Sequence, residues 1–401
     1  MIAQHYKDML GAKSVIRQIS EWSTARGAKI GYENVFDYSL GNPSVPCPPQ
    51  FTAACEDLLQ STDPVTLHGY TPTLTLPSAR KAVAESLNQR FGMDYTADHI
   101  FMTSGAAGAL AHALRCVAVP GQNIVTFAPF FPEYKPYVEG AGLTLRVTPP
   151  RCADFQIDFA DFAPLVDENT AAVLITSPNN PTTTVMRRES LEKLAQFAVK
   201  NDLIVVCDQA FEDSVYDGVE FVTLASLPGM WERTVTVCSI SKGMALSGYR
   251  VAYIVADDHI MDVYYGSAVS VIGATNTASQ LGAIAALKDA SFLEEYNRIF
   301  DRRRKIVYEI FNSIPGVSMA MPESTFLCWV NVSRLGTADE VNAYIIKEAN
   351  VVVNAGTPYG AQGEGHLRIV FGAFREDAQM VTALERVKAA LMKLGKEKGV
   401  S

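Results

Sequence analysis

The sequence predicts an α/β fold: a three-layer domain with a mostly parallel sheet, joined to a smaller α+β domain. Short runs that are apolar at every position, as at 171–176, 203–207, 234–239 and 251–255, are typical of strands covered by helices on both faces. Helical spacing lies between several of these runs, as at 188–201. A chain of 401 residues that is 48% hydrophobic can bury more than one core.

We expect the large domain to span residues 46–285. Apolar residues spaced along one helical face from Leu76 to Phe91 predict its first long helix. After it we expect a strand at 99–103, a helix at 105–119 that stops at Pro120-Gly121, and a strand at 123–128.

Residues 1–45 and 286–401 are expected to form the smaller α+β domain together. Val15, Ile19 and Trp22 lie on one face of an N-terminal amphipathic helix. In the C-terminal part we expect a long helix at 293–315, a strand at 326–331, a helix at 338–349, a strand at 367–371 and a final helix containing Val381 and Leu391.

Composition excludes several classes of function. A net charge of −9 and a pI near 5.3 disfavour a surface that binds nucleic acid or anionic membrane. The basic run at 302–305 falls in a helical pattern and is expected to be a solvated face. No apolar stretch of about 18 residues and no apolar segment near Met1 are present, so we expect neither a membrane span nor a signal peptide.

The cysteines and histidines point to a reduced, metal-free protein. Seven cysteines are scattered singly without CxxC spacing, which is typical of free thiols in the cytoplasm. The six histidines are equally dispersed, so no metal site is expected.

Polar and reactive side chains follow three successive predicted strands. An amide, Asn180, follows the first run, a carboxylate, Asp208, ends the second, and an amine, Lys242, comes just after the third. Ligands of open α/β sheets bind beyond the carboxyl ends of the strands. The three side chains are therefore expected to meet at one cleft.

The same segments carry a resemblance to a known family. SPNNPT at 177–182, DQAF at 208–211 and SISKGMALSGYR at 239–250 are similar to the signature of the class I/II aminotransferases, which are fold-type I pyridoxal-phosphate enzymes. The likeness extends over nearly the whole chain, from SLGNPS at 39–44 and YTPTLTLPSAR at 70–80 to HLRIVFG at 366–372.

The resemblance implies pyridoxal 5′-phosphate as cofactor and assigns its catalytic groups. Lys242 is implied to form a Schiff base with it and later to move a proton. Asp208 is implied to hold a proton on the pyridine nitrogen, which makes the ring an electron sink. Asn180 is implied to donate to the phenolic oxygen and to face the substrate, and Phe131 to stack on the ring.

The phosphate ligands implied by the family are Arg250, Ser239 and the turn at Ser104-Gly105-Ala106, whose backbone N–H groups precede a helix. Tyr70 resembles a tyrosine that reaches the phosphate from a neighbouring subunit. The resemblance therefore implies a homodimer with shared active sites. For Tyr70, Phe131 and the turn, ordinary packing is the alternative interpretation.

Arg368 is implied to grip the α-carboxylate of an amino acid in a two-pronged fork, which lysine could not reproduce. Gly41 is implied to let the N-terminal segment close over that carboxylate, with a simple turn glycine as the alternative. The implied reaction is a ping-pong transfer of an amino group from an amino acid to a 2-oxo acid. Tyr134, Tyr359 and the segment 273–277 are candidates for the side-chain pocket.

Three positions depart from the family pattern. Phe211 stands where tyrosine is usual, so one hydrogen bond to the phenolic oxygen is expected to be missing and the Schiff base to keep its proton to higher pH. Thr183 stands where glycine usually follows NPT. Ala107 stands where one aspartate-preferring subgroup has lysine, which argues against a dicarboxylate substrate.

Three alternatives remain. A pyridoxal-phosphate β-lyase of the cysteine-S-conjugate or cystathionine type would share Lys242, Asp208 and Arg250. A ligand-sensing module of a transcription regulator would need a DNA-binding domain, which the acidic chain does not show before its first predicted helix. A catalytically silent structural protein would have lost the Lys–Asp–Arg set. Decarboxylase and synthase relatives are disfavoured by Arg368, which favours retention of the substrate carboxylate.

Overall fold

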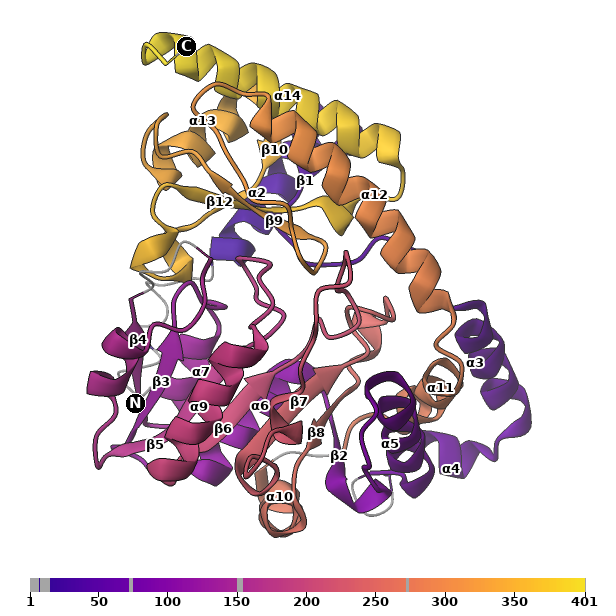
Figure 1. The fold of residues 1–401 in the computed structure, drawn as a ribbon. Helices are drawn as coiled ribbons and strands as arrows, with labels where there is room; N and C mark the ends of the chain where they lie inside the picture. The colour runs from indigo at the N-terminus through magenta and orange to yellow at the C-terminus, as the bar shows by residue number, and fades with distance from the viewer. Residues whose placement is uncertain (1–6, 8–14, 72–74, 150–153, 272–273, 401) are drawn as a thin grey trace.

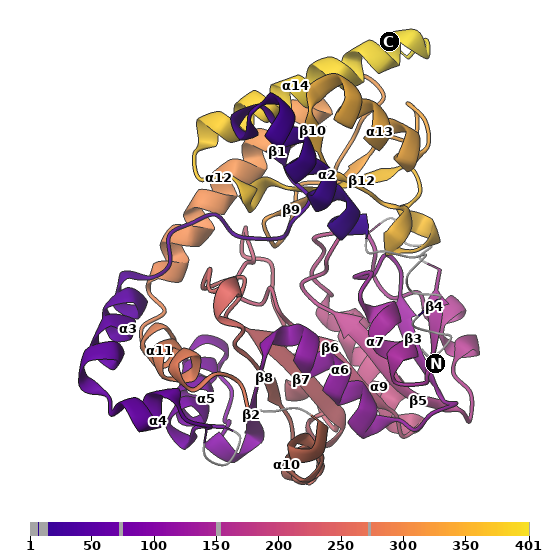
Figure 2. The ribbon, with the colours of Figure 1, turned by 180° about the vertical axis from the view of Figure 1, so that it is seen from behind.

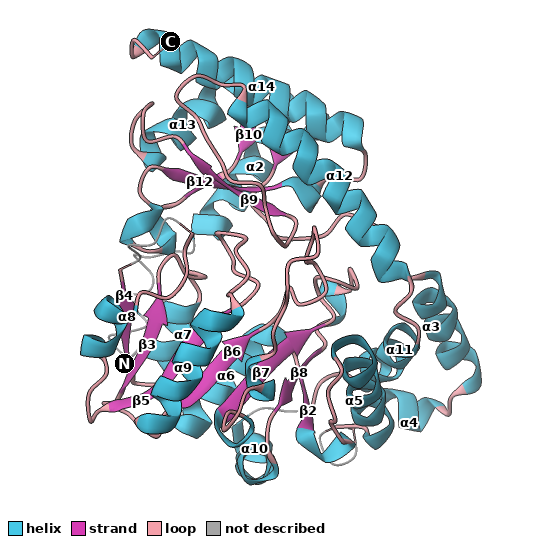
Figure 3. Ribbon diagram, viewed as in Figure 1, coloured by secondary structure: helices cyan, strands magenta, loops and turns pink. Residues whose placement is uncertain are grey.

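A seven-stranded sheet forms the centre of the larger part of the molecule (Figures 1 and 3). The computed structural model describes residues 7, 15–71, 75–149, 154–271 and 274–400. The strands run in the order β2-β8-β7-β6-β5-β3-β4, and only β8 is antiparallel to its neighbours. Their bounds are β2 Ile100–Thr103, β3 Asn123–Phe127, β4 Thr144–Thr148, β5 Thr170–Thr176, β6 Ile204–Asp208, β7 Thr234–Ser239 and β8 Ala252–Val255.

Helices cover both faces of this sheet. Along β5, Ala172 and Leu174 pack in one apolar cluster with residues of α6 and α10, whereas Val173 and Ile175 pack in another with residues of α9. Because successive side chains of a strand point to opposite faces, this alternation makes three layers. The predicted fold class is confirmed. The helices of this part are α3 Pro49–Ser61, α4 Pro64–His68, α5 Pro77–Phe91, α6 Gly105–Val117, α7 Tyr134–Gly140, α8 Phe159–Phe162, α9 Arg188–Lys200, α10 Asp258–Val271 and α11 Thr277–Lys288.

The smaller part lies beyond one end of the sheet in both views (Figures 1 and 2). A three-stranded antiparallel sheet in the order β11-β12-β9 packs with α12 and α14 in one apolar cluster, and β1 pairs with β10. Its elements are α2 Val15–Ile30, β1 Phe36–Asp37, α12 Phe292–Asn312, β9 Leu327–Asn331, α13 Ala338–Ala349, β10 Val351–Val352, β11 Asn354–Ala355, β12 His366–Val370 and α14 Asp377–Glu397. The domain bounds 46–285, 1–45 and 286–401 stay a prediction.

Local sequence signals explain several boundaries. Pro77 opens α5 and Gly92, at φ 65°, ends it in the left-handed conformation that glycine adopts without strain. Thr337 and Glu340 form a capping box at the start of α13. The predicted strands and helices agree with the structure to within a few residues. The sequence analysis did not single out α3, α4, α7, α8, α10, α11, β1, β4, β10 or β11.

The solvated-face prediction for the basic run 302–305 was wrong for its two central residues. Arg303 and Arg304 are 2% and 0% exposed. Arg303 donates to Asp377 and to two backbone carbonyls, and Arg304 donates to Asp217, Asp301 and the Pro322 carbonyl. Burial is possible because each guanidinium has charged and carbonyl acceptors, which helical periodicity cannot reveal.

Candidate functional site

The carboxyl ends of β5, β6 and β7 lie side by side, facing the smaller part of the molecule (Figure 1). In the sheet register Asp208 is opposite Thr176 on one side and Val237 on the other. The chain segment that carries Asn180 leaves β5 at this edge, and Lys242 follows β7 by three residues. The sheet order therefore brings the amide, the carboxylate and the amine to one region.

Lys242 has a buried amine that points at the N-terminal segment. Its Nζ donates a hydrogen bond of 2.5 Å to the carbonyl oxygen of Gly41 and lies 5.9 Å from the centre of the Phe211 ring. Burial, together with the positive charges of Arg368 and Arg250 and against the opposing effect of Asp208, lowers the pKa of Lys242 to about 8. The amine therefore loses its proton at a lower pH than a solvated lysine does.

Asp208 is buried and held by two donors. The Tyr134 hydroxyl donates to its Oδ2 at 2.7 Å, and the Ala210 backbone N–H donates to its Oδ1 at 3.0 Å. Burial raises the pKa of Asp208, while the Tyr134 hydroxyl, the Ala210 N–H and Lys242 act in the opposite direction. The sequence suggested Tyr134 only as a pocket residue, so its contact with Asp208 was missed.

Arg250 and Gly105 are in close contact at the start of α6. A Cβ added at Gly105, whose φ is 79°, would overlap the Arg250 guanidinium. Arg250 itself sits at φ 55° and donates from Nη1 to the Ser247 carbonyl at 2.8 Å. The backbone N–H groups of the first turn of α6 have no partner inside the helix, so this end favours an anion.

The other predicted phosphate ligands lie close by in the chain. Ser239 ends β7, and its hydroxyl accepts a hydrogen bond from the Ser241 backbone N–H at 3.1 Å. Ser104 precedes α6 with an exposed side chain that does not cap the helix, and Ala106 lies half-buried in its first turn. The structure thus places Ser104, Gly105, Ala106 and Arg250 around the start of one helix.

Arg368, in β12 of the smaller part, reaches toward the N-terminal segment and the β5 loop. Its Nη2 donates to the Ser39 carbonyl at 2.5 Å and its Nη1 donates to Asn180 Oδ1 at 3.2 Å. Its Nε is buried and has no hydrogen-bond partner among the described residues. The guanidinium carbon lies 5.2 Å from the centre of the Tyr359 ring. Burial lowers the pKa of Arg368 from its usual value.

The two aromatic candidates differ in their surroundings. Phe211 is buried against Phe326, with ring centres 5.4 Å apart. Phe131 is half-buried and contacts the Tyr134 ring edge-to-face at 5.7 Å, so it lies beside the residue that holds Asp208.

Several predicted residues lie away from this group of side chains, and others fall outside the residues that the structure describes. Tyr70 is 100% exposed, so within one chain its side chain is not part of the buried set. Residues 272–273 lie outside the described residues, whereas Thr277 is buried and its hydroxyl contacts that of Thr71 at 2.7 Å. Ala107 is exposed on α6, and Thr183 adopts φ 67°.

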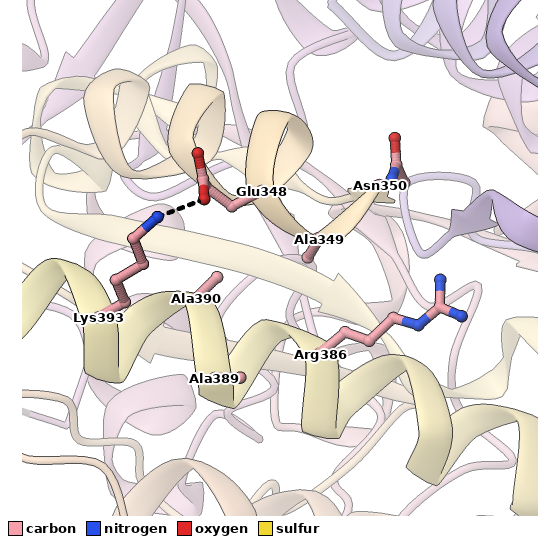
Figure 4. A pocket seen from close by; sticks show the side chains of 7 residues that line it. All are labelled: Glu348, Ala349, Asn350, Arg386, Ala389, Ala390 and Lys393. Atoms are coloured by element: carbon pink, nitrogen blue, oxygen red, sulfur yellow. Dashed lines mark hydrogen bonds and ion pairs between the residues drawn. The ribbon is translucent and has the colours of Figure 1, made fainter.

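A groove outside this region shows different chemistry (Figure 4). It has a volume of about 390 Å³ and lies between α13 and α14. Lys393 is paired there with Glu348 at 2.7 Å, and Arg386 lies over the Phe36 ring at 4.9 Å. Its cations already have partners, so we place the functional site at the strand ends.

The described residues also bear on two other classes of site. No group of three or more His, Cys, Asp or Glu in these ranges is arranged to hold a metal ion. Within the same ranges, no helix has the length and apolar character needed to cross a membrane.

Comparison with known proteins decides the family. The family model for aminotransferase class I and II matches residues 33–387. The chain belongs to the class I and II aminotransferases. The aminotransferase is 30% identical over 367 residues to an aspartate aminotransferase of Pyrococcus abyssi, covering 90% of this chain and 92% of that protein. It is 29% identical to aromatic-amino-acid aminotransferase 2 of Thermococcus litoralis, with 90% and 92% covered.

Solved structures agree with this assignment. The aminotransferase superposes on a Pyrococcus protein called protein-A1 with a TM-score of 0.89 at 28% identity, covering 100% of both chains. An aromatic aminotransferase from Pyrococcus horikoshii gives a TM-score of 0.85 at 28% identity, covering 94% of this chain and 100% of that one.

The aminotransferase is thus an enzyme, and its class depends on pyridoxal phosphate to move amino groups from amino acids to 2-oxo acids. The predicted enzyme class is confirmed. The β-lyase alternative is not favoured, because the family model, the two relatives named above and the Pyrococcus horikoshii structure are all aminotransferases.

Proposed function

We propose that this aminotransferase binds pyridoxal 5′-phosphate at the edge formed by β5, β6 and β7, with Lys242 as its attachment point. The residues present fit the group. A buried amine, a buried carboxylate and a guanidinium pressed against a glycine at a helix start offer partners for its aldehyde, ring nitrogen and phosphate. The single observation that carries the proposal is this convergence of Lys242, Asp208 and Arg250.

The phosphate end is assigned to the start of α6. Arg250 supplies a fixed positive charge, and the absent side chain of Gly105 leaves room for it beside the first turn. Ser104, Ala106 and Ser239 complete the proposed ligand set with backbone N–H and hydroxyl donors. These donors suit a dianion because they combine charge with the partial positive charge of a helix N-terminus.

The ring end is assigned to Asp208, Asn180, Phe211 and Phe131. When bound, the cofactor supplies an aldehyde and a conjugated ring that withdraws electrons from the substrate carbon. Asp208 would accept a hydrogen bond from the protonated ring nitrogen, and Tyr134 fixes the orientation of the carboxylate by donating to Oδ2. Asn180 is assigned to the phenolic oxygen and Phe131 to one face of the ring.

The substrate carboxylate is assigned to Arg368. Its Nε has no partner among the described residues and its Nη2 contacts a backbone carbonyl, so the guanidinium can exchange these weak contacts for an anion. Gly41 accepts a hydrogen bond from Lys242 through its carbonyl, so the N-terminal segment runs close beside the proposed site. Lys242, with its lowered pKa, then acts as general base at the α-carbon in both halves of a ping-pong exchange.

We propose an amino acid with an uncharged or aromatic side chain as donor rather than a dicarboxylate. Ala107 occupies the position where an additional lysine would bind a second carboxylate, and the three cations at the site are already assigned. The relatives named above act, by their names, on aspartate and on aromatic amino acids. A screen of both dicarboxylic and aromatic amino acids as donors therefore decides between these substrate classes.

We further propose a homodimer with shared sites, located in the cytoplasm. Tyr70 is fully exposed and in this proposal reaches the phosphate bound by the second subunit. Leu40 and Tyr249 neighbour Gly41 and Arg250 in sequence. They are exposed apolar residues that the same interface would cover. Six described cysteines are free, in keeping with a reducing compartment.

The test is a half-reaction screen. The purified protein loaded with pyridoxal phosphate is mixed with each amino acid in turn, and the absorbance of the cofactor is followed. We expect conversion to the amine form with a subset of amino acids and restoration by 2-oxo acids. A Lys242→Ala variant should lose both steps; substantial conversion in that variant would contradict the assignment. Release of pyruvate and ammonia from cystathionine without an acceptor would favour the β-lyase instead.

A further inference from the structure

A buried group of charged residues lies behind the loop that carries Lys242. Arg90, at the end of α5, forms an ion pair with Asp213, and its Nη1 lies 3.9 Å from Oε1 of Glu212. The side chains of Asp213 and Glu212 are only 5% and 2% exposed. Cys238, in β7, donates from its Sγ to Oε2 of Glu212 at 3.1 Å. None of these residues belongs to the cofactor site proposed above.

Asp213 is in direct contact with the backbone next to Lys242. A Cβ added at Gly243 would lie 2.5 Å from Asp213 Oδ2, which is closer than real Cβ contacts come. The Asp213 carboxylate therefore fills the space that a side chain at residue 243 would take. Asn297, in the long helix α12, donates from its side chain to the Asp213 backbone oxygen at 2.7 Å. Residue 213 is thus held at two points, its carboxylate by Arg90 and its backbone oxygen by Asn297, and the carboxylate lies against the backbone of residue 243.

The charges of the group limit how Asp213 can move. Two carboxyl groups share one guanidinium, and burial together with the charge of Asp213 raises the pKa of Glu212. The raised pKa favours the protonated form of Glu212, which leaves the Arg90 charge to Asp213. The other titratable groups that act on Glu212 are Asp208 and Cys238. Separating the buried Arg90–Asp213 pair would leave a buried charge without its main partner, so the pair resists displacement.

We propose that Asp213, held by Arg90, is a positioning residue that fixes the 241–244 loop so that the Lys242 amine meets the cofactor aldehyde in a reactive orientation. This inference rests on the proposed function. In the step concerned, Nζ of Lys242 forms a C=N bond with the aldehyde carbon and the aldehyde oxygen leaves as water. A displacement of about 1 Å in a reacting group costs up to about a hundredfold in rate, so a loosened loop would slow this capture.

The experiment uses cofactor-free protein and two probes. Pyridoxal 5′-phosphate reports covalent capture by Lys242 through its absorbance, and pyridoxamine 5′-phosphate, which lacks the aldehyde, reports non-covalent affinity. For Asp213→Asn we expect capture to slow at least about tenfold while the affinity for pyridoxamine 5′-phosphate stays within about threefold. Unchanged capture, or an equal loss of capture and affinity, overturns the proposal.

Further variants keep the test decisive if Asp213→Asn folds poorly. Gly243→Ala leaves every charge in place but pushes the loop off Asp213, and it should slow capture in the same way; normal capture would overturn the proposal. Arg90→Met should slow the capture of pyridoxal phosphate, whereas Arg90→Lys, which keeps the charge, should retain most of the wild-type capture rate.

The matched control is Asp301→Asn, which weakens a buried arginine contact on α12, at Arg304. This control should lower the unfolding temperature without changing the rate at which Lys242 captures pyridoxal phosphate. If it slows capture as much as Asp213→Asn does, loss of stability alone explains the result, and the proposal is overturned. Failure of the wild-type protein to capture pyridoxal phosphate would instead refute the proposed function.

Discussion

The hydroxyl of Tyr134, the first residue of α7, donates to Oδ2 of Asp208, the last residue of β6, at 2.7 Å. Both side chains are buried. A carboxylate taken out of water needs such donors to stay ionised. The ability of Asp208 to serve as the anionic partner of a ring nitrogen therefore depends on a residue from a different element.

Replacing Tyr134 by phenylalanine should weaken cofactor binding. Without the hydroxyl, burial raises the pKa of Asp208 further, because one of the groups that oppose it is lost. We expect the dissociation constant of pyridoxal phosphate to rise about tenfold, the equivalent of one hydrogen bond to a charged group. Equilibrium dialysis of Tyr134→Phe measures this constant, and the control is Tyr344→Phe, at a half-buried tyrosine bonded to Glu397. Equal affinities for the two variants would contradict the role given to Tyr134.

Stability of the cofactor-free protein should depend on pH through Lys242. Its pKa is about 8 in the folded state and near 10.5 when unfolded. Below pH 8 both states carry the proton, and the folded state bears the cost of a buried charge. Between pH 8 and 10.5 the unfolded state binds more protons, so the free energy of unfolding rises with pH.

The measurement compares wild type with Lys242→Met by urea unfolding. The variant should be more stable at pH 7 by about 3 kcal/mol, at about 1.36 kcal/mol per pKa unit. The difference should shrink toward pH 10. Because all other groups are common to both proteins, a difference that does not change with pH would refute the lowered pKa.

Phe211→Tyr should move the pH at which the bound cofactor changes its absorbance. The Phe211 ring lies 5.9 Å from Lys242 Nζ and offers no hydrogen bond. A tyrosine hydroxyl there would stabilise a neighbouring oxygen anion, so the absorbance midpoint of the variant should fall by about one pH unit. A spectrophotometric titration of both proteins decides it. A wild-type midpoint at or below that of the variant would show that Phe211 does not raise it.

Thr183→Gly should stabilise the protein. Thr183 has φ 67°, a left-handed conformation that strains a β-branched residue. Its backbone N–H donates to the Asn179 carbonyl, and its own carbonyl accepts from Ser324, so the turn is held in this conformation. Glycine removes strain of about 1 kcal/mol, offset in part by lost contacts of the buried side chain.

Thermal unfolding measures this, and Thr184→Gly is the control, because residue 184 has no positive φ and glycine there should destabilise. A loss of stability in Thr183→Gly as large as in the control would mean that packing, not strain, dominates at the turn.

Much of the fold and of the candidate site could be predicted from the sequence because the signals are local. Apolar runs such as 171–176 and the helical spacing of 188–201 follow from periods of the backbone itself. The expectation that the amide, the carboxylate and the amine after three strands meet at one edge follows from the topology of parallel sheets. Helix α11 was missed because its residues from 277 to 287 are buried or half-buried all round, which leaves no polar face to detect.

What the sequence by itself determined was the fold class, the family resemblance and the identity of Lys242, Asp208 and Arg250. The tertiary structure alone decided how these groups are supported. It buried Arg303 and Arg304, which the sequence predicted to be exposed, and it placed Tyr134 on Asp208. The physical reason is that burial and hydrogen bonding join residues far apart in the chain, such as Arg304 and Asp217, whose pairing no local pattern encodes.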